Sequence, residues 1–189
     1  YYVPSTFLRQ TANMECSVGM WLYVKDLVTT VRAPNDYLHV LHYGSRPDSR
    51  QLASAVNPSD GGSACVSRLS DFVKLQIFGL YLDNRQNNLL VLAGEDAEPK
   101  VRYDNFPMKQ WFHVCVVVRQ DALELYVDGG LHDTAVLTKS PTMRDNLAEA
   151  ELFVSYTPVT GMMQTLEYHN IPPTAHEIRR VASDRSKLR

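Results

Sequence analysis

Two groups of acidic residues come closest to the spacing of a hydrolytic site. One is the segment 95–98 (EDAE), and the other is Glu124 with Asp128. A retaining glycosidase needs two carboxyl groups about 5 Å apart. A glycine and a proline flank the first group, which is typical of a turn, and its adjacent acids would point in opposite directions on a strand. Glu124 and Asp128 would share a strand face about 13 Å apart. Neither group predicts a catalytic pair, so we expect no enzyme and keep a glycoside hydrolase as a remote alternative.

A histidine and a cysteine two residues apart, His113 and Cys115, are the nearest approach to a nucleophile with its base. On a strand they would share a face about 6.8 Å apart. We therefore interpret Cys115 as a core cysteine and His113 as a packing histidine that donates a hydrogen bond from within the sandwich. The sequence contains no Gly-x-Ser-x-Gly motif.

Three cysteines argue against a complete disulfide framework, because their number is odd. Cys16 is predicted to be buried in a strand, whereas Cys65 lies in a polar segment. The Asn-x-Ser/Thr match at residues 57–59 has proline in the middle position, which blocks glycosylation. These features favour maturation in a reducing compartment.

Metal ligands are scattered along the chain. Asp128, Asp133 and residues 145–146 could supply oxygens to a hard cation, but they form no Asp-rich loop of fixed spacing. His39 and His42 are three residues apart on a predicted strand and so would lie on opposite faces, which makes a poor zinc pair. We predict no cofactor, with calcium as the alternative.

Exposed aromatic and basic side chains are the candidate binding residues. A tyrosine ring with one polar end suits stacking against a sugar together with hydrogen bonding. Tyrosine is equally at home on a sheet, so ten tyrosines need no ligand to explain them. The candidates for carbohydrate binding are Tyr23, Tyr126 and Tyr168. The candidates for contact with a protein partner are Arg46, Arg50, Arg179, Arg180 and Arg185.

The elements that must position these residues are clearest between Trp111 and Leu131. The segment 111–119 (WFHVCVVVR) is apolar on both faces, which predicts a central strand covered on both sides. The segment 123–128 (LELYVD) alternates, which predicts a strand with one face in the core and one in water. Asp128-Gly129-Gly130 follows and tolerates positive φ, so the chain can reverse at once.

The remaining chain continues this pattern of short strands separated by turns. Such spacing indicates an all-β, two-sheet antiparallel sandwich or jelly roll. One short C-terminal helix is predicted at 173–182, with Thr174 as its N-cap and Glu177 as the capping-box partner. The other strands are predicted at 5–8, 14–24, 37–43, 72–82, 88–93, 100–104, 133–137, 150–155 and 162–168.

We expect residues 1–189 to form one domain, with two special segments. The segment 44–70 has no strand pattern and is either a surface excursion or a contact arm. The basic tail at 183–189 either complements the helix dipole or docks on an acidic neighbour. A net charge of −2 predicts no nucleic-acid partner, and no apolar run is long enough to span a membrane. The chain begins with Tyr1, so we expect that it can be part of a longer precursor.

Three segments resemble concanavalin A-like jelly-roll domains of the laminin G and pentraxin type. WFHVCVVV followed by LELYVDGGL is similar to their Trp-x-His-Val hairpin, and CSVGMWLYV at 16–24 is similar to an early strand. Residues 161–178 resemble the last strand and the closing helix. Gly19, the second glycine at 130 and Met162-Met163 depart from the family pattern. The resemblance implies the sandwich fold, and laminin G and pentraxin relatives often bind calcium.

Two functions fit these observations. The first is a non-enzymatic interaction module, because the strand and hairpin motifs are similar to those of proteins from large double-stranded DNA viruses. That resemblance implies a minor capsid or other virion component, assembled in host cytoplasm and packed against capsid subunits. The second is a lectin-like module that binds cell-surface glycans. The two are compatible in a virion surface protein.

Overall fold

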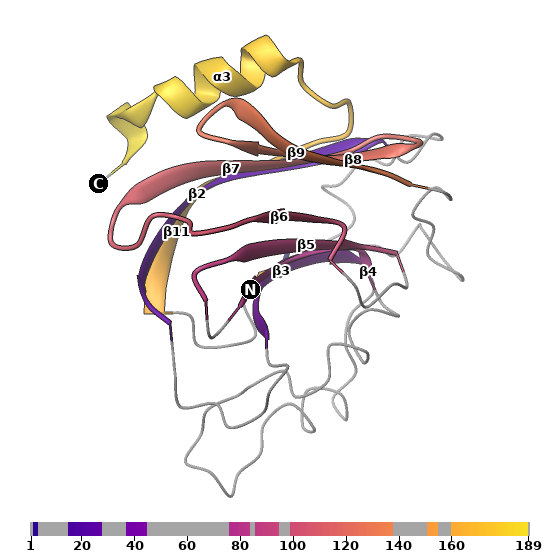
Figure 1. Cartoon of the computed structure of the whole chain (residues 1–189). Coiled ribbons are helices and arrows are strands. Elements are labelled where there is room, and N and C mark those ends of the chain that lie inside the picture. The colour runs from indigo at the N-terminus through magenta and orange to yellow at the C-terminus, as the bar shows by residue number, and fades with distance from the viewer. Residues whose placement is uncertain are drawn as a thin grey trace, which may run out of the picture.

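Two antiparallel sheets packed face to face form the body of the protein in a computed structural model (Figure 1). The structure describes residues 2–3, 15–27, 37–44, 76–83, 86–94, 99–137, 151–154 and 160–188. The predicted all-β sandwich with one short C-terminal helix is confirmed. Within the described residues, no helix is long and apolar enough to cross a membrane.

The first sheet, called sheet A here, has six strands in the order β1-β10-β3-β4-β5-β6. Every neighbouring pair in it is antiparallel. The strands are β1 (Tyr2–Val3), β3 (Tyr37–Gly44), β4 (Gln76–Asp83), β5 (Leu89–Ala93), β6 (Val101–Tyr103) and β10 (Glu151–Val154).

The second sheet, sheet B, has five strands in the order β11-β2-β7-β8-β9. All its pairs are antiparallel, and β7 lies at the centre, as its two apolar faces predict. The strands are β2 (Cys16–Asp26), β7 (Trp111–Val118), β8 (Ala122–Val127), β9 (Gly130–Val136) and β11 (Thr160–His169).

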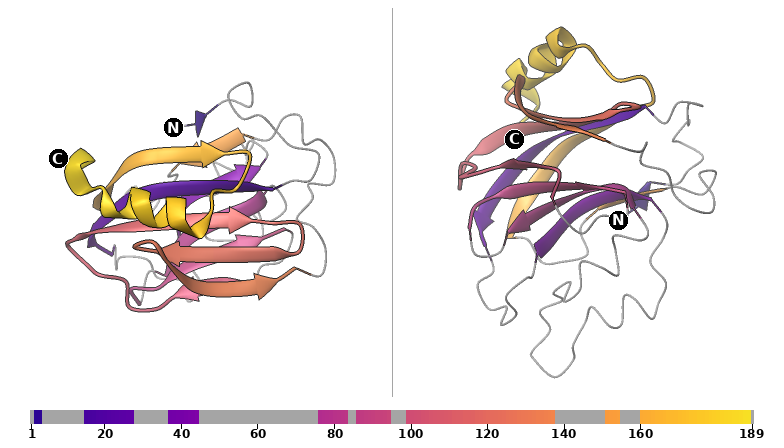
Figure 2. Two further views of the ribbon diagram at one scale, coloured as in Figure 1. Left: turned by 90° about the horizontal axis from the view of Figure 1, so that it is seen from above. Right: turned by 45° about the vertical axis from the view of Figure 1, so that its right-hand side comes forward.

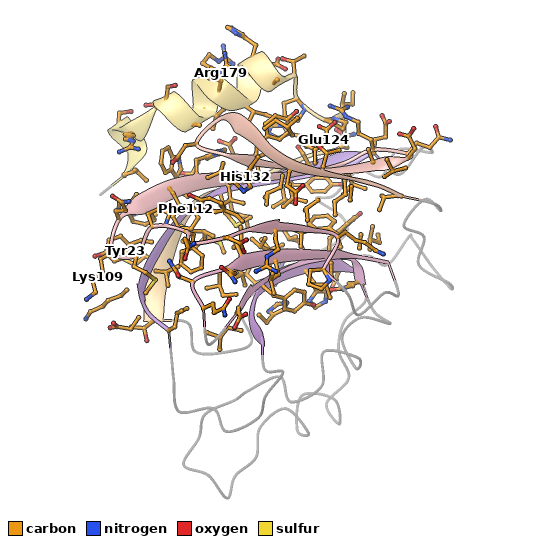
Figure 3. All side chains as sticks on the ribbon, in the orientation of Figure 1. Tyr23, Lys109, Phe112, Glu124, His132 and Arg179 are labelled. Atoms are coloured by element: carbon orange, nitrogen blue, oxygen red, sulfur yellow. The ribbon has the colours of Figure 1, made fainter. Side chains whose placement is uncertain are left out.

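The core lies between the sheets and is supplied by alternate residues of each strand. On β7 the even-numbered side chains from Phe112 to Val118 face inward, opposite Leu80, Leu82 and Val91 of sheet A. Figure 3 shows Phe112 between the two layers. The thiol of Cys16 lies in this core, where burial raises its pKa to about 12. The prediction that Cys16 is a small buried apolar residue is therefore confirmed.

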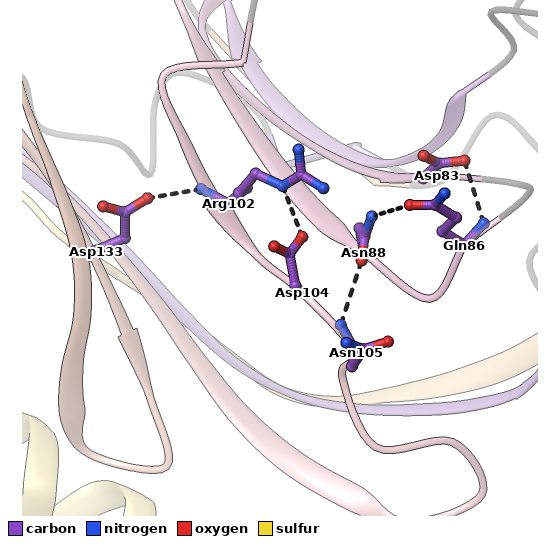
Figure 4. Close-up of polar contacts among 7 residues, drawn as sticks. All are labelled: Asp83, Gln86, Asn88, Arg102, Asp104, Asn105 and Asp133. Atoms are coloured by element: carbon purple, nitrogen blue, oxygen red, sulfur yellow. Dashed lines mark hydrogen bonds and ion pairs between the residues drawn. The ribbon is translucent and has the colours of Figure 1, made fainter.

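At one lateral edge of the sandwich, a hydrogen bond joins the two sheets, and further polar contacts lie beside it within sheet A (Figure 4). The Asp133 carboxylate of β9 accepts hydrogen bonds from the backbone N–H of Arg102 in β6, at 3.0 Å, and from the N–H of Thr134, at 2.8 Å. Arg102 also forms an ion pair with Asp104, and Asn88 links the neighbouring turns through Gln86 and Asn105. Asp133 therefore caps backbone amides of both edge strands.

Helix α3 (Ala175–Ser183) lies on the outer side of sheet B, away from the core (Figures 1 and 2). Its N-cap is Thr174, which forms the predicted capping box with Glu177. Ile178 packs into a small cluster with Cys115, Val117 and Tyr126. A 3₁₀ turn, η4 (Arg185–Lys187), follows within the segment predicted as a basic tail.

The tip of the β8–β9 hairpin supports this helix. Asp128 and Gly129 both have positive φ, +46° and +82°, as the Asp-Gly-Gly sequence predicts. A Cβ at Gly129 would lie 2.7 Å from Cα of Arg179. Only glycine therefore lets the hairpin tip and the helix approach this closely.

Three predictions about strand faces are wrong, each for a local reason. His39 and His42 do not lie on opposite faces, because a bulge between His39 and Leu41 shifts the register and brings the rings 2.9 Å apart, Nε2 to Nδ1. His113 does not lie inside the sandwich but on the outer face of sheet B. The outer face of β8 is not fully in water, since α3 covers Tyr126.

Most strand boundaries are within a few residues of the prediction. The expected strand at 5–8, the segment 45–70 and Cys65 lie outside the described residues, as do Arg46 and Arg50.

Candidate functional site

A cleft of about 260 Å³ lies between helix α3 and the outer face of sheet B. Its floor is the sheet itself, at Gly19 of β2 and at His113 and Cys115 of β7. One wall is the last part of β11, and the other is α3. The lining residues are Gly19, His113, Cys115, Glu167, His169, Ile171, Pro172, Pro173, Glu177, Ile178, Arg180 and Val181.

The floor of the cleft is open because residue 19 has no side chain. Gly19 pairs with Cys115 across the sheet, and the rings of Trp21 and His113 lie in the next row. A Cβ at residue 19 would lie 3.6 Å from Nε2 of His113 and 3.8 Å from Sγ of Cys115. These are ordinary contact distances, so the backbone does not require glycine here.

His113 is the polar group at the bottom of the cleft. The residue is only 3% exposed, and within the described part of the chain its Nδ1 atom has no hydrogen-bond partner. The ring meets Trp21 edge-on, with centroids 5.3 Å apart. Burial lowers the pKa of His113, and the carboxylates of Asp128 and Glu167 oppose that shift. The ring is therefore neutral at physiological pH, with one donor and one acceptor nitrogen.

The rim of the cleft carries both charges. Glu167 and His169 of β11 approach each other at 3.7 Å, Oε2 to Nε2. Glu177 and Arg180 stand on the helix side. Ile171, which is 73% exposed, and two prolines add apolar surface. A small neutral ligand with several hydroxyl groups finds donors, acceptors and apolar contact here.

Two further ionisable groups of the cleft have shifted pKa values. Burial raises the pKa of the Cys115 thiol to about 12, so this residue is not a thiolate nucleophile. Hydrogen bonds from the Thr174 backbone and side chain lower the pKa of Glu177, whereas a general acid needs a raised one. At neutral pH the thiol of Cys115 is therefore protonated, and Glu177 is a carboxylate.

The structure does not bring the three candidate tyrosines together. Tyr23 is half-buried against Trp111, near the end of sheet B opposite Glu124 (Figure 3). Tyr168 packs on the core and on Tyr43, with ring centroids 5.7 Å apart. They therefore share no platform.

The prediction that Tyr126, the third candidate, is an exposed aromatic residue is wrong. It is 5% exposed beneath α3, and its hydroxyl donates to Glu124 at 3.1 Å.

Three of the candidate arginines do gather on the helix side of sheet B. Arg179 and Arg180 are exposed on α3, and Arg180 also lines the cleft. The guanidinium carbon of Arg185 lies 5.7 Å from the centre of the Trp21 ring. The tail thus contacts its own sheet through a cation–π interaction.

Two of the acids considered for calcium accept backbone hydrogen bonds, and residues 145–146 lie outside the described residues. Asp128 accepts from the backbone N–H of His113 at 2.9 Å, and Asp133 caps the edge strands. In the part of the chain that the structure describes, no cluster of three or more His, Cys, Asp or Glu side chains could hold a metal ion.

Sequence reasoning missed the cleft and its residues Gly19, Glu167, His169 and Arg180 as a group. The available signal was the apolar outer face of the 111–119 strand, because another element must cover an apolar face to keep it from water. Nothing local identifies that cover as the C-terminal helix.

No protein family model matches this sequence, and no curated protein matches it either. Among solved structures, the fold is similar to the Trypanosoma rangeli sialidase, with a TM-score of 0.61 and 15% identity over 98% of this chain and 26% of that chain. It is similar to the receptor binding domain of botulinum neurotoxin C/D mosaic serotype, with a TM-score of 0.59 and 14% identity over 95% and 38% of the chains.

The binding domain of botulinum neurotoxin serotype D gives a TM-score of 0.57 and 12% identity over 90% and 37% of the chains. At these identities the similarity shows the fold alone. The chain spans about a quarter of the sialidase and somewhat more than a third of the toxin domain chains.

Proposed function

We propose that this chain is a non-enzymatic, concanavalin A-like module that binds carbohydrate. The observation that carries the proposal is the cleft beneath α3, where a buried neutral imidazole lies below a rim of carboxylate, imidazole and guanidinium groups. Two of the similar folds belong to binding domains of a neurotoxin and one to a sialidase, which is compatible with a glycan ligand.

The raised pKa of Cys115 argues against a thiolate nucleophile in the cleft, which supports binding without turnover. A broad glycan array, probed with the purified chain with and without calcium, tests the proposal. We expect binding to a limited set of glycans that does not require calcium. Silence across the array in both conditions would reject the function, and release of sugar from a bound glycan would reject the non-enzymatic part.

A second candidate is an interaction module of a virion, which packs against capsid subunits assembled in host cytoplasm. The exposed Arg179 and Arg180 favour contact with an acidic protein surface. None of the similar structures named above is a virion protein, so this candidate rests on the sequence resemblance and on these arginines. A density map of intact particles that lacks this chain at every shell position would exclude it.

A further inference from the structure

We infer that the cleft beneath α3 holds one neutral monosaccharide unit over Gly19, with a sugar hydroxyl hydrogen-bonded to Nε2 of His113. The inference rests on the proposed carbohydrate-binding function and names its site and ligand class. It replaces the tyrosine platform, which the structure does not assemble.

The size of the cleft sets the size of the ligand. Pockets for drug-sized molecules range from about 300 to 1,000 Å³. A volume of about 260 Å³ is below that range. It suits a single sugar ring, and a second unit would have to extend past the rim at Ile171.

His113 selects for a hydroxyl group. Nδ1 of His113 is buried and has no hydrogen-bond partner among the described residues, so the ring nitrogen available to a ligand is the other one. The opposite nitrogen, Nε2, lies on the Gly19 side of the ring. A hydroxyl can donate to Nε2 or accept from it, so it binds either neutral tautomer, whereas a carboxylate can only accept. Trp21 fixes the orientation of the ring, so its position is set before a ligand arrives.

The rim disfavours an anionic sugar. Among the lining residues, the carboxylates of Glu167 and Glu177 face one guanidinium, that of Arg180. A carboxylate on the ligand would be repelled by two like charges and attracted by one. Sugar hydroxyls instead donate to carboxylates and accept from a guanidinium.

Gly19 makes the space for the ring. Glycine weakens a strand interior, and an alanine here would meet neighbours no closer than 3.6 Å. Packing therefore does not explain the glycine, whereas the open floor of the cleft does.

Titration calorimetry with methyl glycosides of glucose, galactose, mannose and N-acetylglucosamine tests the inference, with sialic acid as the anionic comparison. We expect the wild-type chain to bind a neutral glycoside. Gly19→Val and His113→Phe should each weaken that binding at least tenfold, and the milder Gly19→Ala at least threefold. The matched controls are Gly130→Val and His132→Phe, which make the same changes on β9, away from the cleft. Thermal unfolding of every variant checks that it is folded.

The outcomes separate the two proposals. If the wild type binds and all five variants bind alike, the site is wrong and the carbohydrate function stands. If sialic acid binds best and Arg180→Gln abolishes that binding, the neutral class is wrong. If the wild type binds no glycoside and no glycan on the array, the function fails, and the site inference fails with it.

Discussion

The outer faces of the two sheets both bury histidine side chains, but in opposite ways. On sheet A, His39 and His42 hydrogen-bond each other at 2.9 Å, and Tyr81 donates to Gln76 at 2.6 Å. All four side chains are almost fully buried, and among the described residues Nε2 of Gln76 has no hydrogen-bond partner. On sheet B, His113 is as deeply buried, yet its Nδ1 atom has no partner and its ring borders a cleft.

Each sheet has an unpartnered buried polar atom, so what distinguishes His113 is the cleft beside its ring. A polar group buried without a partner costs about 1–3 kcal/mol, whereas a paired one contributes about 1 kcal/mol. The histidine pair on sheet A therefore stabilises that face as it stands. On sheet B, the unpartnered Nδ1 atom of His113 carries this cost, while the Nε2 atom lies beside Gly19, where we place the ligand.

The largest expected effect comes from weakening the contact between α3 and the outer face of sheet B. Ile178→Ala deletes the main apolar contact of α3 with sheet B, at a cost of about 2–5 kcal/mol. In a Cys65→Ser background, the labelling rate of Cys115 by a thiol reagent should rise at least about thirtyfold, since 1.4 kcal/mol is a factor of ten. Cys16, in the core, is the internal control. An unchanged rate at Cys115 would show that α3 does not protect this face.

Replacing one histidine on each face should separate their roles. His42→Leu removes the hydrogen bond to His39 and should lower the free energy of unfolding by about 1–3 kcal/mol. His113→Phe removes an imidazole that has an unpartnered nitrogen, so it should cost less than about 1 kcal/mol. Urea denaturation measures both values. Equal losses of unfolding free energy in the two variants would contradict the different roles of His42 and His113.

Acidification should weaken sheet A more than sheet B. Burial, with the nearby His42, lowers the pKa of His39 well below its usual value of 6.5, and burial lowers that of His113 less, since carboxylates oppose it. The unfolded chain then binds more protons than the folded chain below about pH 6.5, so stability is lost as the pH falls. The slope approaches about 1.4 kcal/mol per pH unit for each fully shifted group.

Urea midpoints at pH 7.5 and 5.5 test this prediction. His39→Leu should remove more of the pH dependence than His113→Phe. If His113→Phe removed more of the pH dependence than His39→Leu, the larger pKa shift would lie on sheet B.

The smallest expected effect is a gain in stability. Gly19→Ala should raise the free energy of unfolding by about 0.4–1 kcal/mol, because it restricts the unfolded chain and its Cβ meets no close neighbour. Gly129→Ala is the contrasting variant and should destabilise, since its Cβ would lie 2.7 Å from Arg179. Thermal unfolding distinguishes them. A loss of stability in Gly19→Ala would mean that packing, and not a ligand, explains this glycine.

The sequence was sufficient where the signal is local. The alternation at 123–128, the Asp-Gly-Gly turn and the Thr174–Glu177 capping box depend on neighbours within a few residues, and the structure confirms each. The burial of Cys115 followed equally from the two apolar faces of its strand.

The candidate site was not predictable in the same way. The bulge in β3 inserts one residue into the alternation and so places His39 and His42 on the same face. The side of His113 was open because both faces of its strand are apolar, so the alternation does not show which face is the core. The burial of Tyr126 depends on where α3 returns, about 50 residues further along the chain. Such long-range placement follows from the packing of the whole sandwich and produces no periodic pattern in the sequence.

The carboxylate of Asp133 has a consequence for how copies of this molecule can associate. Because it occupies the amides of Arg102 and Thr134, an incoming β-strand finds no free donors at those two positions. Fibre growth by edge-to-edge stacking is thereby discouraged on that flank. Any ordered array of these molecules would instead have to be joined through side chains.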